Sequence, residues 1–237
     1  MPEAGSEDAR IARVTAALAM AESDSTHTLC RQAARLVGVS GAGVVLVSGG
    51  RPLGNVCVSD PITDAVEDIQ YTLGEGPCIE AYRTRSPVLV PDLADAGPAR
   101  WPGFGEGARA NGVLAAFGFP LLVHTICVGA LNLYCTSVGS LSDEQYSEAV
   151  AVAQVASSMV LDWQAVAGPG SLARQLEQIP VHRAAVHQAA GIVSVQGAMT
   201  VDDALAWIRA YAFAEAESIG NVASAIVARQ LHYGDGS

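Results

Sequence analysis

Two long apolar segments that follow each other almost directly restrict the fold of this chain most. Residues 114–123 and 126–136 are each a near-continuous run of apolar residues, and only His124 and Thr125 separate them. Extended segments joined by so short a connection pair as an antiparallel hairpin. Because polar residues do not alternate with the apolar ones, both faces of the hairpin have to be covered. We therefore expect these strands at the centre of a sheet with helices on its faces.

The surrounding segments predict an α+β domain, a central antiparallel sheet flanked by helices, over residues 9–163. A β-branched run over residues 43–48, a turn at Ser48–Gly50 and an extended segment over residues 52–59 predict a hairpin, and residues 87–91 a short strand. Residues 92–98 read as a loop. Apolar spacings of three and four, with capping residues, predict helices over Ala9–Met20, Ser25–Val37, Thr63–Ile69, from Pro77, Trp101–Asn111, and from a capping box at Ser142.

The segment Ala167–Ser171, which reads Ala-Gly-Pro-Gly-Ser, separates this domain from a purely helical remainder. Residues 164–180 are expected to form a linker and coiled-coil helix, with Leu172, Leu176 and Ile179 on one seam that Pro180 interrupts. Such a seam favours a homodimer. Residues 181–237 are expected to form an all-α unit of three helices, the second of which is capped at Thr200.

Charge and hydropathy limit the function classes. The net charge is −11, lysine is absent, and all 13 basic residues are arginines, so a general polyanion-binding protein is disfavoured. The first ten residues do not resemble a secretory signal, and the longest apolar stretch, Val113–Val123, is broken by Gly118 and Pro120. We expect a cytoplasmic protein without a membrane segment.

The reactive residues predict neither catalysis nor metal binding. Five cysteines without a CxxC pair favour reduced thiols in the core over a disulfide framework or a zinc site. The five histidines show no metal-ligand spacing, and no serine lies in a nucleophile-elbow context. We expect no enzymatic activity, no metal and no cofactor. The alternative, an enzyme on the same scaffold, requires titratable groups that converge in a pocket.

The first domain resembles the GAF domains of actinobacterial regulators. The segment Tyr71–Ala81, which reads YTLGEGPCIEA, carries the resemblance. It continues through Val90–Leu93, Arg100–Pro102, Gly118–Leu121 and Gly129–Tyr134 in the same order. This resemblance implies a sensor domain for a small-molecule or protein signal of unknown identity.

The last helices resemble the ANTAR domain, and GAF followed by ANTAR is a known order of domains. The resemblance rests on Val186–Val193, followed by Ala204, Arg209, Ala212 and Val222-Ala223, and on an arginine at 183. It implies binding of RNA, namely tandem hairpins in nascent transcripts, and hence transcription antitermination. The RNA-binding residues that we predict on this basis are Arg183, Gln188, Ala189, Gly191, Arg209 and Asn221.

Two departures from the ANTAR pattern weaken the predicted RNA affinity. Ala190 stands where the family commonly has a basic residue, and Glu217, Ser218 and Gly220 occupy a region that is often basic. Each lost cation reduces phosphate neutralisation, so the affinity should be weak or depend on dimerisation. The alternative is a sensor of small molecules or redox state whose degenerate ANTAR domain works through protein contacts.

Within the expected sensor domain, Cys78 is a candidate for redox sensing and the loop Gly74–Pro77 is a candidate for anion binding. Cys78 lies at an expected helix N-terminus, where a lowered thiol pKa would make it a redox-responsive sensor candidate. A buried, inert thiol is the alternative. The loop Gly74–Pro77 can cradle an anion, but Glu75 opposes this, and a tight turn into a helix is favoured.

Overall fold

The chain divides into two units, Met1–Leu172 and Ala173–Ser237, which we call the N-terminal and the C-terminal unit. The computed structural model describes residues 3–19, 26–48, 51–167, 181–215, 217 and 219–234. The predicted linker seam of Leu172, Leu176, Ile179 and Pro180 lies outside the described residues. Among the described residues, no helix is both long and apolar enough to cross a membrane.

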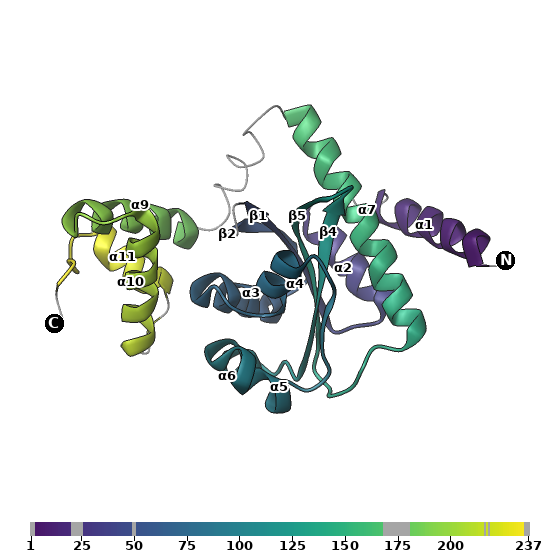
Figure 1. Cartoon of the computed structure of the whole chain (residues 1–237), viewed down its shortest axis with the longest axis horizontal. Coiled ribbons are helices and arrows are strands. Elements are labelled where there is room, and N and C mark those ends of the chain that lie inside the picture. Colours follow the sequence, from purple (N-terminus) through teal and green to yellow (C-terminus); the bar gives the residue numbers. More distant parts are fainter. Residues whose placement is uncertain are drawn as a thin grey trace. The chain divides into compact units, whose positions relative to one another are not determined.

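A five-stranded antiparallel sheet in the order β2-β1-β5-β4-β3 forms the centre of the N-terminal unit (Figure 1). The two long apolar segments are neighbouring inner strands, as the sequence predicts, and they pair from Ala115 with Cys135 to Val123 with Ile126. The strands are β1 (Gly41–Ser48), β2 (Arg51–Val58), β3 (Val88–Val90), β4 (Ala115–Val123) and β5 (Ile126–Cys135).

Helices cover both faces of this sheet, which confirms the predicted GAF-like α+β class (Figure 1). On one face lie α1 (Glu3–Ala19), α2 (Thr26–Val37) and α7 (Asp143–Ala167), with α2 against β1 and β2 and α7 against β4 and β5. On the other lie α3 (Pro61–Leu73), α4 (Pro77–Thr84), α5 (Leu93–Arg100) and α6 (Pro102–Ala110).

Side-chain caps explain where several helices begin. Asp60 accepts hydrogen bonds from the backbone N–H groups of Ile62 and Thr63 at 2.9 and 3.0 Å and so starts α3. The predicted capping box of α7 is confirmed, because Ser142 and Gln145 exchange side-chain to backbone hydrogen bonds of 3.0 and 3.2 Å.

The expected loop over residues 92–98 is wrong, because α5 begins there. Asp92 Oδ1 accepts a hydrogen bond of 2.8 Å from the backbone N–H of Ala94, which is a helix-initiating contact. Leu93 is fully buried and attaches the start of this helix to the core. Gly97 and Pro98 suggested a loop, but tertiary packing outweighs their low helix propensity.

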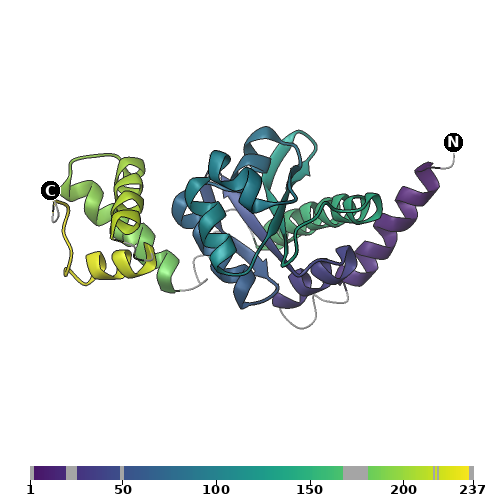
Figure 2. The ribbon, with the colours of Figure 1, turned by 90° about the horizontal axis from the view of Figure 1, so that it is seen from below.

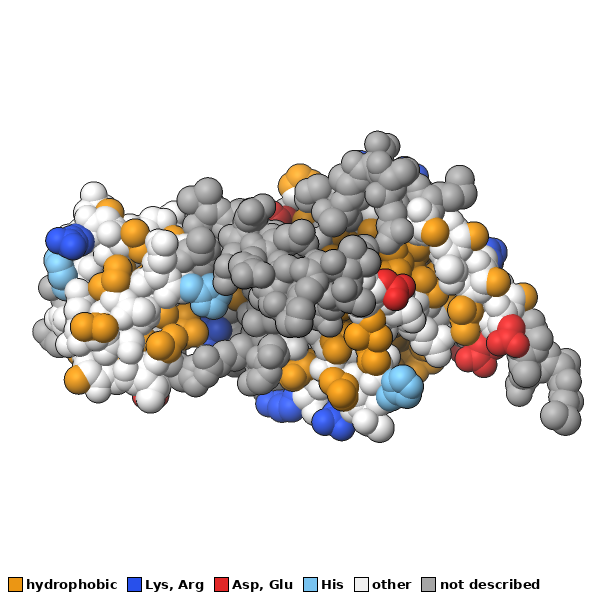
Figure 3. Space-filling model, turned by 90° about the horizontal axis from the view of Figure 1, so that it is seen from above, with side chains coloured by type: hydrophobic (Ala, Val, Ile, Leu, Met, Phe, Trp, Pro, Cys, Tyr) orange, Lys and Arg blue, Asp and Glu red, His pale blue; other side chains and the backbone are white. Residues whose placement is uncertain are grey.

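The C-terminal unit contains three described helices, α9 (Val181–Gln196), α10 (Val201–Ala214) and α11 (Ile219–Val227) (Figures 1 and 2). The predicted cap of α10 is present, since Thr200 Oγ1 accepts from the N–H of Asp203 at 3.1 Å. Figure 3 shows hydrophobic side chains among polar ones on the face of this unit that it draws. Its core consists mainly of small and β-branched residues: Val186, Ala189, Ala190, Val193, Ala204, Ile208, Ala212, Val222, Ala223 and Ile226.

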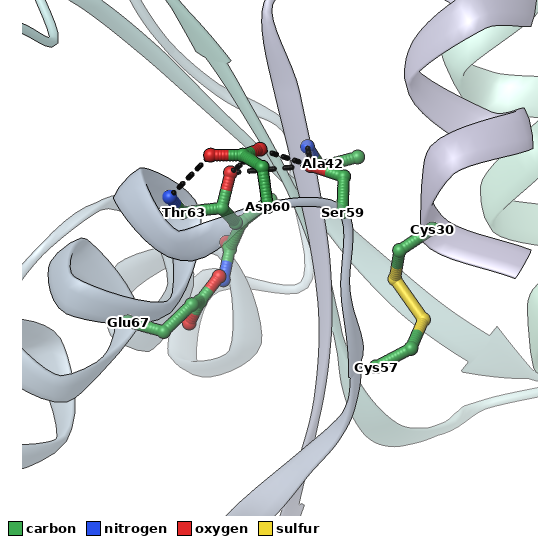
Figure 4. The surroundings of a disulfide bond; sticks show 8 residues. Cys30, Ala42, Cys57, Ser59, Asp60, Thr63 and Glu67 are labelled. Carbon is green, nitrogen blue, oxygen red and sulfur yellow. Dashed lines mark hydrogen bonds between the residues drawn. A yellow bond between two sulfur atoms is a disulfide. The ribbon is translucent and has the colours of Figure 1, made fainter. Parts of the chain in front are cut away.

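A disulfide joins Cys30 of α2 to Cys57 of β2, with a Cα–Cα distance of 5.8 Å (Figure 4). The expectation that all the cysteines are reduced core thiols is therefore wrong for this pair. The reason is that α2 packs on β1 and β2, so two residues 27 positions apart in sequence meet in the core. Cys78, Cys127 and Cys135 are free thiols.

Candidate functional site

A buried network of polar side chains joins α3 and α4 to the central strand β5. Asn132 Nδ2 and the Tyr134 hydroxyl donate to Glu67 Oε1 at 2.7 and 3.1 Å. Gln70 Nε2 donates to the Tyr134 hydroxyl at 2.8 Å, and Gln70 Oε1 accepts from the backbone N–H of Cys78 at 3.0 Å. Glu67, Gln70, Asn132 and Tyr134 are all at most 2% exposed. The bonds to the Glu67 carboxylate join α3 to β5, and the neutral bond from Cys78 to Gln70 joins α4 to α3.

The sequence itself contains a signal for this network, in the spacing of its polar residues. Glu67 and Gln70 are three residues apart, so they share one face of α3. Asn132 and Tyr134 are two residues apart in an otherwise apolar strand, so they share one face of β5. Polar residues at these spacings within apolar elements indicate a common buried partner.

The Gly-Glu-Gly-Pro loop is the part of the predicted sensor motif that organises this region. Gly74, at φ 64°, ends α3 in the left-handed conformation. Glu75 Oε1 accepts from the backbone N–H groups of Gly103 and Phe104, both at 2.9 Å, and thereby caps α6. Gly76, at φ 128°, leaves room for Gln70, because a Cβ there would lie 2.4 Å from Gln70 Oε1. The loop thus acts as a turn with its own carboxylate at a helix N-terminus.

Cys78 lies in the first turn of α4, as predicted, but it does not have the lowered pKa that this position suggested. The residue is 1% exposed. Burial raises the pKa of the Cys78 thiol well above its ordinary value, and the nearby negative charge of Glu67 raises it further. Burial and Glu67 also raise the pKa of Tyr134. The thiol is therefore protonated and shielded at neutral pH, and its role as a sensor stays a prediction.

These raised pKa values predict a loss of stability at alkaline pH. A thiol in the unfolded chain ionises at about pH 8.5, whereas Cys78 in the folded protein keeps its proton at that pH. The unfolded state then binds fewer protons than the folded state, so the free energy of unfolding falls as the pH rises above about 8.5. Urea unfolding between about pH 7 and about pH 9.5 measures this effect. Cys78→Ala should give a shallower decline than the parent, and an identical decline would contradict the assignment to Cys78.

A crevice of about 380 Å³ lies between α1 and α7 in the N-terminal unit. Glu7 and Arg10 line it from α1, and Tyr146, Val150 and Gln154 line it from α7. The buried Glu148 of α7 accepts a hydrogen bond of 2.7 Å from Arg13 of α1. This ion pair holds α1 against the helix that leads out of the domain.

The predicted RNA-binding residues whose side chains are described do not all lie on one surface. Gln188 and Gly191 line the same groove of the C-terminal unit, and Asn221 is exposed on α11. Ala189 is fully buried and serves the core of the unit. Arg209 is half-buried, its Nε is inaccessible, and it interacts with another residue. Arg183 lies in α9, but its side chain is outside the described part.

We searched the described residues for a possible metal-binding site. No group of three or more His, Cys, Asp or Glu side chains converges there in a way that could hold a metal ion.

The antiparallel sheet, the helices on both faces and the loop between α3 and α4 define an α+β domain of the GAF type. The GAF domain family (GAF_2) matches residues 20–160, more than half of the chain. The chain therefore belongs to the GAF family, a family of small-molecule sensing domains. A search of curated proteins found no match.

Several solved structures are similar to this chain at low sequence identity. The GAF domain from an Acinetobacter phosphoenolpyruvate-protein phosphotransferase is 15% identical, with a TM-score of 0.50, and the match covers 68% of this chain and 96% of that one. The corresponding domain from Coxiella burnetii is 14% identical, with a TM-score of 0.49 and coverages of 69% and 98%. Free methionine-R-sulfoxide reductase from Neisseria meningitidis is 17% identical, with a TM-score of 0.47 and coverages of 70% and 95%.

Proposed function

We propose that the chain is a signal-responsive RNA-binding regulator of transcription antitermination, in which the GAF domain controls an ANTAR-type output unit. The observation that carries this proposal is the separate three-helix unit after the GAF domain. Its core uses the small residues of the ANTAR-like segment, among them Ala189, Ala212 and Ala223, while Gln188 and Asn221 of the same segment are exposed. This pattern of burial supports a helical unit that presents polar groups to a partner.

The path for the signal in this proposal is α7. This helix contacts β4, β5, α1 and α2, and it continues to Ala167 at the end of the domain. A signal that binds two conformations of the domain with different affinity would shift α7 and thereby the output unit. The regulator is proposed to act as a cytoplasmic homodimer, without enzymatic activity of its own.

The charge of the output unit sets the expected strength of RNA binding. Residues 181–237 contain three arginines against five acidic residues. Non-specific affinity for phosphates grows with the number of cations in contact, so this unit should bind RNA weakly and with a small salt dependence. Two units in a dimer that engage two hairpins at once would raise the affinity through effective concentration.

A mobility-shift assay with the full chain tests the proposal. The probe is a pool of RNAs with two adjacent hairpins and randomised loops, and a fully paired duplex of equal length is the control. We expect the hairpin pool to shift at low salt, to bind more tightly than the duplex, and to be released as salt increases. The oligomeric state of the same sample is measured by light scattering. A folded dimer that shifts neither RNA at low salt would reject RNA binding.

One observation favours a second candidate, an output unit that works through protein contacts. Val195 on α9 is 83% exposed, and Val201 and Val227 are also partly exposed. Val195 and Val227 line the same groove, and a contiguous apolar patch is typical of a docking surface. In the assay above, this candidate predicts no RNA shift.

A further inference from the structure

A groove between α9 and the end of α11 is the most distinctive surface of the C-terminal unit. Its volume is about 750 Å³. Gln188, Ile192 and Val195 line it from α9, and Val227, Arg229 and His232 line it from the end of α11 and the residues that follow. A Cβ built at Gly191, another lining residue, would meet no other atom within 4 Å, so the space beside this residue is open. The lining thus combines apolar side chains with polar and basic ones.

The charge of the groove is opposite to that of the chain as a whole. None of the lining residues is acidic, although the chain carries a net charge of −11. Arg229 is exposed, and its guanidinium forms no ion pair with another described residue. The half-buried Arg209, by contrast, is already engaged within the fold. Arg229 is thus better placed than Arg209 to contact an external phosphate.

An aromatic surface adjoins the groove at Gln196, one of its lining residues. The backbone N–H of Tyr233 donates to Gln196 Oε1 at 3.0 Å, and the Tyr233 side chain is 41% exposed. Its ring lies 5.2 Å from that of Trp207, which in turn lies 5.3 Å from that of Tyr211. The supported, partly exposed ring of Tyr233 is suited to stacking with a base.

We propose that this groove binds unpaired nucleotides of an RNA loop, an inference that rests on the RNA binding proposed above. Arg229 contacts a phosphate, Tyr233 stacks with a base, and the exposed amide of Gln188 contacts a base edge. Val195 lies beside the bound strand and supplies apolar contact. Unpaired loops fit better than paired RNA, because only splayed-out bases can reach an aromatic ring and an amide.

Opposite charges at Val195 provide the sharpest test. Val195 is 83% exposed, so neither Val195→Arg nor Val195→Glu should disturb the fold. Binding of the hairpin pool is measured by fluorescence anisotropy at several salt concentrations, with the full chain and each variant. We expect Val195→Arg to tighten binding and Val195→Glu to weaken it, each by about five- to tenfold. Arg229→Ala should weaken binding by a similar factor and lower the slope of log affinity against log salt by about one.

Arg109→Ala is the matched control, since Arg109 is an exposed arginine on α6 of the other unit and should leave the affinity unchanged. If the groove instead binds an apolar protein segment or a second copy of the chain, both Val195 variants reduce assembly in light scattering and neither changes RNA affinity. That outcome would reject the groove as the RNA-binding site. Tight RNA binding that is unchanged by the Val195 and Arg229 variants would also reject the groove, but it would support RNA binding elsewhere on the chain. A parent chain that binds no RNA would reject the proposed function itself.

Discussion

Reduction of the Cys30–Cys57 disulfide is expected to lower the free energy of unfolding by about 3.5 kcal/mol. The bond closes a loop with a sequence separation of 27 residues, and its removal restores conformational freedom to the unfolded chain. It also frees β2, an edge strand, from the helix α2 that covers it. Urea unfolding with and without a thiol reductant measures the difference.

The double variant Cys30→Ala, Cys57→Ala separates the bond from other effects of the reductant. This variant should be less stable than the oxidised parent and insensitive to reductant, because both sulfurs are gone. Cys135→Ala, which alters a free, half-buried thiol, should keep the full response to reductant. A parent protein whose unfolding midpoint is the same with and without reductant, while mass spectrometry shows the bond intact beforehand, would contradict this prediction.

Glu67→Ala is expected to cost about 3 kcal/mol of stability, because it leaves two buried donors without their acceptor. Asn132 Nδ2 and the Tyr134 hydroxyl both donate to Glu67 Oε1, and both groups lie in the core. Water cannot replace the carboxylate unless the core opens, so the loss should also loosen the contacts of α3 with the sheet. Urea unfolding gives the stability, and hydrogen exchange of the α3 amides reports the loosening.

Two matched variants show whether the network carries this effect. Glu67→Gln keeps an acceptor oxygen of similar size and should cost clearly less than Glu67→Ala. Glu106→Ala removes an exposed glutamate from α6 and should be nearly neutral. Equal losses for Glu67→Gln and Glu67→Ala would mean that the charge or the packing of Glu67 matters more than its hydrogen bonds.

The sequence predicted those parts of the fold that depend on local pattern. The paired apolar strands follow from their continuous hydrophobicity, and the starts of α7 and α10 follow from the capping residues Ser142 and Thr200. Helix α5 was missed, because Gly97 and Pro98 suggest a loop whereas the burial of Leu93 and the cap at Asp92 determine the conformation. Local propensity is a weak guide where tertiary contacts compete with it.

The candidate sites depend more on contacts between residues far apart in the sequence than the helices and strands do. The pairing of Cys30 with Cys57 arises when α2 packs on the sheet, which no short motif encodes. The spacing of Glu67 and Gln70 indicates a buried partner but does not identify Asn132 and Tyr134 as that partner. In the C-terminal unit, the resemblance favoured Arg209, but exposure favours Arg229, which follows the last residue of α11. Exposure is a property of the assembled unit, so the sequence pattern could not rank these two arginines.

Binding of the tandem-hairpin RNA pool to the folded full chain at low salt decides whether this GAF protein is an RNA-binding regulator. We predict a saturable complex that favours looped hairpins over duplex, that weakens as salt rises, and that responds in opposite directions to arginine and glutamate at position 195. A correctly folded protein that leaves both RNAs free at every concentration would contradict it.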